Sequence, residues 1–452
     1  MEIEIISVSE SPGKYIIYKP RTGLAFIGNH AMAAIAQRLA ESPDGQVDVS
    51  PDIDDFLQSI GFYLPDPPEP PRPEDSFLPT TAVLLMTNQC QLRCTYCYAA
   101  AGEAPPEKLT PELGYAAIDA VCKNAMDTGR TAFEVSFHGG GEPTFNWHVL
   151  KACAEYAREK PLLARLTLTS NGIWSPRQCD WIVNNLDGLS LSLDGSPETQ
   201  DNQRPLLLGG RSSELVMRTV AELDRREFAY SIRMTATAPW ERLPQDMRFL
   251  CENTGCRNFQ VEPAFNTERG GHGDSDTDAG MAFVRAYLEA HDIATQHGRN
   301  LMYSGARLGQ VTTTFCTAPY NALIVNGGGA IVTCYEVASP AHPLSSISTI
   351  GSINDRAIAI NTDARSHLHN LMAERRDACR DCFCYWSCAG DCYARVFADE
   401  PDGHQIRGVR CQMNRTLTEQ LLLRRMAEGN GVWQKSASAS VPLNGMEMEI
   451  SS

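Results

Sequence analysis

The stretch that decides the fold is Cys90-Gln91-Leu92-Arg93-Cys94-Thr95-Tyr96-Cys97, in which three cysteines stand four and then three residues apart. An apolar run at residues 82–86 comes shortly before it, so we expect the thiols on a loop at the end of a strand. Thiolates select soft metals, which leaves zinc or an iron–sulfur cluster. Zinc would want a fourth protein ligand close by, and none follows in the sequence. A [4Fe–4S] cluster has four irons to ligate, so three cysteines leave one iron free for a small molecule.

This cysteine pattern, with an aromatic residue before the last thiol, resembles the signature of the radical S-adenosylmethionine (SAM) enzymes. The resemblance implies that Cys90, Cys94 and Cys97 hold a cluster whose open iron binds the amino and carboxylate groups of SAM. In that family the reduced cluster cleaves SAM to methionine and a 5′-deoxyadenosyl radical. The alternative is a loop of buried thiols or an isolated zinc site.

Length and composition narrow the remaining classes. The chain has 452 residues, room for two or three domains, and a formal net charge of −16, which argues against nucleic acid and anionic membranes as partners. No apolar stretch of the sequence is as long as the run of about eighteen residues that a membrane-spanning helix needs. Glu2 and Glu4 stand where a signal peptide has basic residues. Sixteen cysteines therefore indicate metal or redox chemistry rather than disulfides, in the cytoplasm.

Predicted strands and helices alternate from residue 81 to about residue 300. Such alternation predicts a parallel sheet with ligand sites at the carboxyl ends of its strands, and the cysteine loop obeys this rule. The pattern matches the partial (β/α)6 TIM-like barrel of the radical SAM enzymes. The predicted strands are residues 82–86, 132–137, 165–169, 189–193, 229–235 and 259–262.

Three further segments at predicted strand ends resemble marks of the same family. His138-Gly139-Gly140-Gly141-Glu142-Pro143 resembles the GGEP motif that hydrogen-bonds the SAM ammonium. Thr169-Ser170-Asn171-Gly172 resembles the TNG segment near the SAM carboxylate. Ser192-Leu193-Asp194-Gly195 resembles the SLDG segment that lies along the ribose and carboxylate.

Two arginines are candidates for the SAM carboxylate, Arg204 and Arg233, because a guanidinium forks well onto that group. The alternative for each is a surface ion pair. Tyr96 is expected near adenine, or else as a core aromatic, and residues 261–263 are expected where the last barrel strand meets adenine. The predicted SAM contacts are thus Tyr96, Gly140, Gly141, Glu142, Pro143, Ser170, Asn171, Ser192, Asp194, Arg204 and Arg233.

A second cysteine pattern comprises Cys316, then Cys334 at the end of a GxxxxC segment, then Cys379-x2-Cys382-x5-Cys388-x3-Cys392, and finally Cys411. These seven cysteines match the whole motif of the SPASM domain, which carries auxiliary clusters in one radical SAM subfamily. The resemblance implies three [4Fe–4S] clusters in all, in addition to bound SAM. The first auxiliary cluster would keep an open iron for a substrate thiolate or amide, or borrow Cys384, and a zinc knuckle is the alternative for residues 379–392. The first auxiliary cluster would be held by Cys316, Cys334 and Cys392, and the second auxiliary cluster by Cys379, Cys382, Cys388 and Cys411.

The N-terminal residues 1–63 read as a small α+β unit, with a hairpin at 15–18 and 24–27 and helices at 29–39 and 52–60. The unit resembles a shortened winged-helix domain that takes up a leader peptide as an added strand. The alternative is a small packing domain that covers the barrel.

Composition divides the rest of the chain. A Pro-rich linker at 64–80 precedes the radical SAM core at 81–300 and the SPASM domain at 301–425. A leucine-rich helix is expected at 417–426. Residues 426–452 form a tail that reads as disordered from 433 onward. The loop at 266–278 either covers the substrate or is a solvated loop. Five further thiols are expected in the core or half-buried: Cys122, Cys153, Cys179, Cys251 and Cys256.

The resemblance, over residues 81–425, implies a maturase that abstracts hydrogen from a residue of a ribosomally synthesised peptide and forms a thioether or carbon–carbon crosslink. Expected partners are a short precursor peptide with a leader and a reductant such as flavodoxin or ferredoxin. One alternative is a formylglycine-forming sulfatase-type maturase, which needs an acidic residue near the first auxiliary cluster and no leader-binding unit. The other is a non-catalytic iron–sulfur electron-transfer protein.

Overall fold

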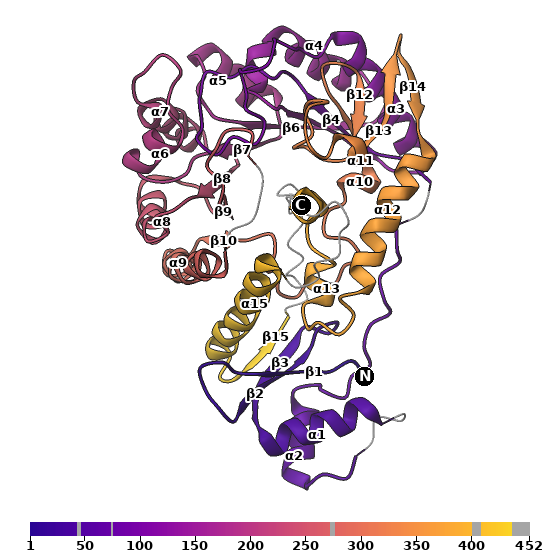
Figure 1. The fold of residues 1–452 in the computed structure, drawn as a ribbon, viewed down its shortest axis with the longest axis vertical. Helices are drawn as coiled ribbons and strands as arrows, with labels where there is room; N and C mark the ends of the chain where they lie inside the picture. Colours follow the sequence, from indigo (N-terminus) through magenta and orange to yellow (C-terminus); the bar gives the residue numbers. More distant parts are fainter. Residues whose placement is uncertain (43–46, 74–75, 272–275, 400–407, 436–452) are drawn as a thin grey trace.

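The structure is a computed structural model that describes residues 1–42, 47–73, 76–271, 276–399 and 408–435. Parts of the predicted linker (74–75), loop (272–275), SPASM domain (400–407) and tail (436–452) therefore lie outside the described residues. The centre is an eleven-stranded sheet of order β10-β9-β8-β7-β6-β5-β4-β11-β12-β13-β14. Figure 1 shows this sheet curving around the middle of the molecule with helices on its outer side.

The predicted core strands are confirmed to within two residues at each end, and neighbours along the chain pair in parallel. Two more strands join in parallel at the sides, β10 (Asn300–Met302) on β9 and β11 (Ala322–Val325) on β4. The parallel sheet is therefore two strands wider than predicted, and β10 crosses the expected boundary at residue 300. The core strands are β4 (Thr81–Leu85), β5 (Ala132–His138), β6 (Leu163–Ser170), β7 (Gly188–Ser192), β8 (Tyr230–Ala236) and β9 (Asn258–Pro263).

Helices between these strands begin at clear capping signals. The Thr110 hydroxyl accepts from Leu113 N, with proline next in the chain, and Ser175 forms a capping box with Gln178. The predicted core thiols are confirmed as buried, since Cys122, Cys153, Cys179, Cys251 and Cys256 are at most 6% exposed. The helices are α3 (Pro111–Asp127), α4 (Trp147–Arg158), α5 (Pro176–Asn185), α6 (Pro197–Gln203), α7 (Ser212–Arg225), α8 (Arg242–Asn253) and α9 (Thr277–Gln296), with a short 3-10 turn η1 (Pro143–Asn146).

The cysteine-rich region continues the barrel sheet instead of forming a separate sheet. Strand β11 lies on β4, and β12 (Ala330–Val332), β13 (Thr349–Asn354) and β14 (Ala357–Ile360) follow it in antiparallel order. The predicted helix at 417–426 lies within a longer helix, α15. The helices of this region are α10 (Ala318–Asn321), α11 (Ser345–Ser348), α12 (Thr362–Asp377), α13 (Tyr385–Cys388), α14 (Tyr393–Asp399) and α15 (Val409–Glu428).

The N-terminal sheet combines both ends of the described chain, in the order β1-β2-β3-β15. The predicted hairpin is confirmed as β2 (Lys14–Lys19) and β3 (Leu24–Asn29), preceded by β1 (Glu4–Ser7) and followed by α1 (His30–Glu41) and α2 (Pro51–Ser59). One face of the sheet packs on both helices, and the other packs on α15 and the loop around Cys384. Figure 1 shows this unit below the curved sheet.

Strand β15 (Val432–Gln434) corrects the prediction that the chain is disordered from residue 433. Val432 pairs with Phe26 and Trp433 with Ala25, in antiparallel register along β3. The prediction is wrong for Trp433 and Gln434 because their partner strand lies about 400 residues earlier, where no local sequence signal reaches. No helix in the described part of the chain is long and apolar enough to span a membrane.

Candidate functional site

A cavity of about 2310 Å³ extends along the inner side of the curved sheet. Pockets for a single drug-sized ligand are about 300–1,000 Å³, so this space admits more than one small molecule. Its lining includes two cysteine triads, from the loop after β4 and from the cysteine-rich region. They are Cys90, Cys94 and Cys97, and Cys316, Cys334 and Cys392.

The loop that carries the first triad is held by main-chain contacts to distant segments. Arg93 N donates to Pro205 O at 2.8 Å, and Thr95 N donates to Gln203 O at 2.9 Å. The Arg269 guanidinium donates to Cys94 O and Ala101 O, each at 2.8 Å, and forms an ion pair with Glu103. Arg269 lies in the predicted loop at 266–278, and its role was missed because an arginine in a polar loop has no signature of its own. The described part of that loop therefore covers the cysteine loop.

Burial dominates the acidity of these thiols. It raises the pKa of Cys90 to about 12, helped by the Glu142 carboxylate, and the pKa of Cys94 to about 11 against the opposing charge of Arg204. Both thiols are therefore protonated at neutral pH when no metal is bound. A cationic metal centre would displace these protons, so the two thiols would become thiolate ligands only when the metal binds.

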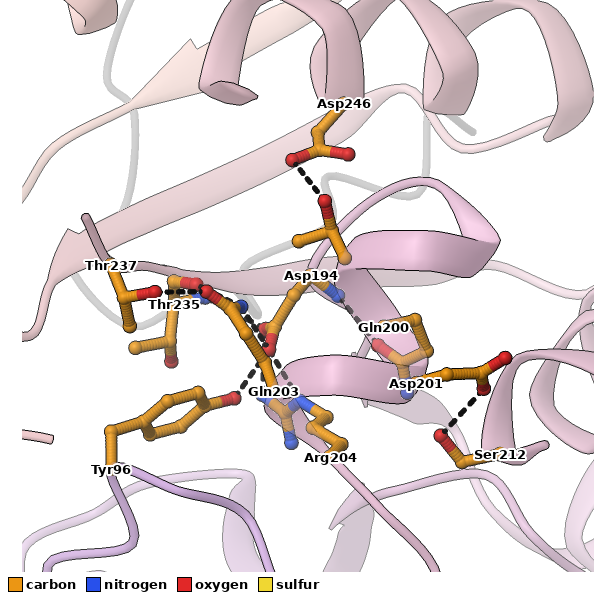
Figure 2. Close-up of polar contacts among 11 residues, drawn as sticks. Tyr96, Asp194, Gln200, Asp201, Gln203, Arg204, Ser212, Thr235, Thr237 and Asp246 are labelled. Atoms are coloured by element: carbon orange, nitrogen blue, oxygen red, sulfur yellow. Dashed lines mark hydrogen bonds and ion pairs between the residues drawn. The ribbon is translucent and has the colours of Figure 1, made fainter. Parts of the chain in front are cut away.

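Asp194 organises the polar contacts behind the cysteine loop, as Figure 2 shows. Its buried carboxylate accepts two bonds from Arg204, at 2.9 and 3.0 Å, one from Tyr96 Oη at 2.5 Å and one from Thr235 N at 2.9 Å. Gln203 donates a further bond at 2.8 Å. Since Tyr96 stands between Cys94 and Cys97 in the sequence, this carboxylate ties the cysteine loop to β7, α6 and β8.

The same contacts change the interpretation of Arg204. The structure shows the ion-pair alternative, but with Asp194 as the partner and in the interior rather than on the surface. Arg233, by contrast, is exposed on β8, donates to Gln260 Oε1 at 3.1 Å and lines the cavity. Arg233 therefore has the more accessible guanidinium of the two, and its binding to a carboxylate remains a prediction.

Glu142 also makes internal contacts. Its buried carboxylate accepts from Ser170 Oγ at 2.7 Å, Thr144 Oγ1 at 2.8 Å and Asn171 N at 2.9 Å, which joins the ends of β5 and β6. Burial raises the pKa of Glu142, and these hydrogen bonds oppose the shift. A Cβ on Gly141 would lie 2.2 Å from the Gln89 carbonyl oxygen, so this position needs glycine for the close approach of the cysteine loop.

The predicted SAM contacts differ in their access to the cavity. Pro143 and Asp194 are not among the residues that line it, and Pro143 begins η1. The remaining candidates do line it. They are Tyr96, Gly140, Gly141, Glu142, Ser170, Asn171, Ser192, Arg204 and Arg233.

The second triad lies close to an ion pair that the sequence did not indicate. Cys334 interacts with both Cys392 and Cys316, and among charged groups Glu336 raises the pKa of this thiol most. Arg395 donates to the Glu336 carboxylate at 2.5 Å, and both residues line the cavity. The carboxylate is therefore placed beside the triad.

Cys384 does not join this second triad. Its buried thiol interacts with Cys382 and Cys388 and lies 4.0 Å from Asn414 O, so the suggestion that it completes the first auxiliary set is wrong. Adjacent cysteines in the sequence here diverge in space because the turn at 389–391 is entirely left-handed, with φ of 49°, 89° and 68°. The turn separates Cys388, which interacts with Cys411, from Cys392, which interacts with Cys334.

The remaining four cysteines form a third set outside the cavity lining, around a buried ion pair. Arg410 donates to Asp391 at 3.0 and 3.1 Å. Burial is the main cause that raises the pKa of Cys388, and the charge of Asp391 is the second. Asn414 donates to the Cys388 thiol at 3.7 Å. The set comprises Cys379, Cys382, Cys388 and Cys411.

These donors suit iron–sulfur clusters. All sixteen cysteines are free thiols, and ten of them gather in three sets. Among the described residues, no three His, Cys, Asp or Glu side chains lie close enough together to hold a single metal ion. Sets of three and four thiols match the soft donors that iron–sulfur clusters take.

Comparison with known proteins agrees with this donor chemistry. Residues 84–238 match the model of the radical SAM superfamily. The chain is similar to the sporulation killing factor maturation protein SkfB of Bacillus subtilis, 25% identical over 285 residues that span 62% of this chain and 66% of that protein.

Solved structures show the same fold at low identity. Native anSMEcpe with bound AdoMet matches with a TM-score of 0.63 at 15% identity, over 77% of this chain and 99% of that one. Streptococcus suis SuiB bound to its precursor peptide SuiA matches with a TM-score of 0.52 at 15% identity, over 90% of this chain and 100% of that one. The second match thus extends over more of this chain than the first.

Proposed function

Because residues 84–238 form a radical SAM domain, we propose that this protein is a radical SAM maturase with a SPASM domain that installs a thioether or carbon–carbon crosslink in a ribosomally synthesised peptide. The observation that carries the proposal is the cavity that both cysteine triads line. A radical made at one triad and an electron acceptor at the other would face the same substrate.

The cofactors follow from the three thiol sets. Cys90, Cys94 and Cys97 would hold the SAM-binding cluster, and the other two sets would hold auxiliary clusters. When bound, cluster and SAM supply the 5′-deoxyadenosyl radical that abstracts hydrogen. A reductant such as flavodoxin or ferredoxin, in the cytoplasm, would provide the electron.

The chain's own residues orient the reactants. Glu142 and Gly141 brace the turn beside the cysteine loop, and Arg233 offers a guanidinium to a carboxylate in the cavity. His138 also lines the cavity. Its pKa is lowered to about 4, mainly by burial and to a lesser extent by the charge of Arg233. His138 is therefore neutral near pH 7. Its Nδ1 is buried and has no hydrogen-bond partner among the described residues.

A peptide substrate is favoured by size. The cavity exceeds what SAM and a small metabolite would fill. SuiB has been solved with the precursor peptide SuiA, and anSMEcpe with the Cp18Cys peptide. The N-terminal sheet gives a leader two possible edges, β1 or β3, and in this structure β15 occupies the edge of β3.

The second candidate is a formylglycine-forming maturase, and Glu336 favours it as an acidic residue beside the first auxiliary triad. The N-terminal sheet disfavours it, since that reading requires no leader-binding unit. A pure electron carrier is disfavoured by a triad that leaves one iron open.

Coexpression with candidate precursor peptides tests the proposal. The expected product is a peptide lighter by two hydrogens, together with 5′-deoxyadenosine formed after addition of dithionite and SAM. Deleting residues 1–63 should abolish peptide binding while SAM cleavage remains. An unchanged peptide mass with every precursor would contradict crosslinking, and absence of 5′-deoxyadenosine would contradict radical chemistry.

A further inference from the structure

The first auxiliary triad is one thiol short of the four ligands that a four-iron cluster takes. Cys316, Cys334 and Cys392 supply three thiols, and Cys384 packs beside Tyr18 and the other auxiliary set. A four-iron cluster held by three thiolates keeps one iron that takes a different donor. That donor is another residue of the chain, a substrate atom or solvent.

Glu336 stands two residues after Cys334, in the turn that follows β12. Its main-chain N–H donates to the Cys334 thiol, and Val337 N donates to Cys334 O at 3.2 Å. These bonds hold the turn closed beside the cysteine. Glu336 and all three thiols line the same cavity.

The two carboxylate oxygens of Glu336 differ in their contacts. Oε1 accepts from Arg395 at 2.5 Å. Oε2 is buried and has no hydrogen-bond partner within the part of the chain that the structure describes. A buried acceptor without a partner costs about 1–3 kcal/mol, more when charged, and so indicates an ion or other group that completes the site.

The electrostatic neighbours show where this carboxylate acts. Burial raises the pKa of Cys334 and of Cys392, and Glu336 is the next largest cause for both thiols. It is also the leading charge that acts on Tyr98, which follows Cys97. The carboxylate therefore acts on both thiols and on Tyr98, and all four residues line one cavity.

We propose that Glu336 is the fourth protein ligand of the first auxiliary cluster, through Oε2. The inference rests on the proposed function, because it requires that cluster. Carboxylates are common ligands of iron, and Arg395 would orient this one by holding the other oxygen. A carboxylate has the same charge as a thiolate but is a harder donor, so the iron at this corner would exchange its ligand more readily than an all-cysteine site.

Pulsed EPR of full-length protein tests the assignment. The parent carries Cys90→Ala, Cys94→Ala and Cys97→Ala to remove the signal of the SAM cluster, is labelled with ¹³C-glutamate and is loaded anaerobically with iron and sulfide. The reduced parent should show a ¹³C coupling that Glu336→Gln abolishes. The matched control is Glu134→Gln, which removes another carboxylate that lines the cavity, on β5, and should keep the coupling.

Mild ferricyanide oxidation gives a second measurement. Glu336→Gln should lose the unique iron and form a three-iron cluster at least tenfold faster than the parent, and Glu336→Cys should slow the loss below that of the parent. A parent without ¹³C coupling, or oxidation rates equal in parent and Glu336→Gln, would overturn the inference and leave the proposed function standing. A parent that binds no iron after loading would overturn both.

Discussion

Replacing Asp194 by asparagine should destabilise the barrel strongly. The aspartate side chain is fully buried and its partner Arg204 is 9% exposed, so Asp194→Asn leaves a guanidinium charge uncompensated in the interior. Removing one member of a buried pair costs about 3–5 kcal/mol. The asparagine amide would also point N–H donors at a group that already donates, Tyr96 Oη in one amide orientation or Thr235 N in the other.

The assay is anaerobic urea unfolding, with the shift in midpoint converted to free energy through the slope of each transition. Asp127→Asn is the matched control, because Asp127 pairs with Lys123 at 2.5 Å in an exposed i,i+4 contact. That pair is worth about 0.5 kcal/mol or less. A cost for Asp194→Asn below about 1 kcal/mol, close to that of the control, would refute the argument that the buried pair holds the barrel together.

A double variant separates stability from cluster binding. Asp194→Leu with Arg204→Met removes both charges, so most of the lost stability should return. Tyr96 Oη would still lack its acceptor, and the cysteine loop would remain loosely held. We therefore expect iron bound at the SAM cluster to stay below the wild-type level, measured as 5′-deoxyadenosine yield and iron content. Full recovery of both would show that Asp194 acts on the fold alone.

Three other outcomes follow from the structure. Val432→Pro should break the pairing of β15 with β3 and tighten leader-peptide binding at least severalfold in fluorescence anisotropy; unchanged affinity would show that the leader does not use this edge. Arg269→Ala removes two charge-assisted bonds to the cysteine loop, each worth about 1.5–3 kcal/mol, so a chelator should strip the SAM cluster at least tenfold faster than from the exposed control Arg211→Ala. The rate at which iodoacetamide alkylates Cys90 of the apoprotein, followed by mass spectrometry, should rise about tenfold per pH unit from pH 7 to 9, because the pKa of about 12 keeps the reactive thiolate scarce. A rate that reaches a plateau near pH 8.5 would contradict the raised pKa.

Local sequence was sufficient for the barrel strands because each one is a short apolar or alternating run followed by its own turn or loop chemistry. It was insufficient for β11–β14, which are three to six residues long and extend the barrel from a region recognised only by its cysteines. It also missed β15, whose stability as a strand comes from β3 and from the ring of Tyr18, 6.4 Å from that of Trp433. Short strands are stabilised by the strands they pair with, and only the tertiary structure shows which strands those are.

In the candidate site, too, some residues could be predicted from the sequence and others could not. Spacing along the chain singled out the cysteines, because three stand on one short loop and seven more match the spacing of the SPASM motif. It did not identify what surrounds them. Arg204 looks from the sequence like a ligand-binding arginine, but Asp194 already accepts two of its hydrogen bonds. Nothing local distinguishes Glu336 or Arg269 from any other charged residue in a loop.

By itself the sequence determined the ten cysteines of the cluster motifs, the order of strand and helix through the barrel, and the chemistry that three thiols on one loop imply. Only the tertiary structure decided that two of the cysteine sets line one cavity, that Cys388 and Cys392 turn apart, and that an acid lies beside the triad at Cys334. The reason is physical: donor type and spacing are local properties of the chain. The charge, burial and partners of a side chain depend on segments that folding brings to it.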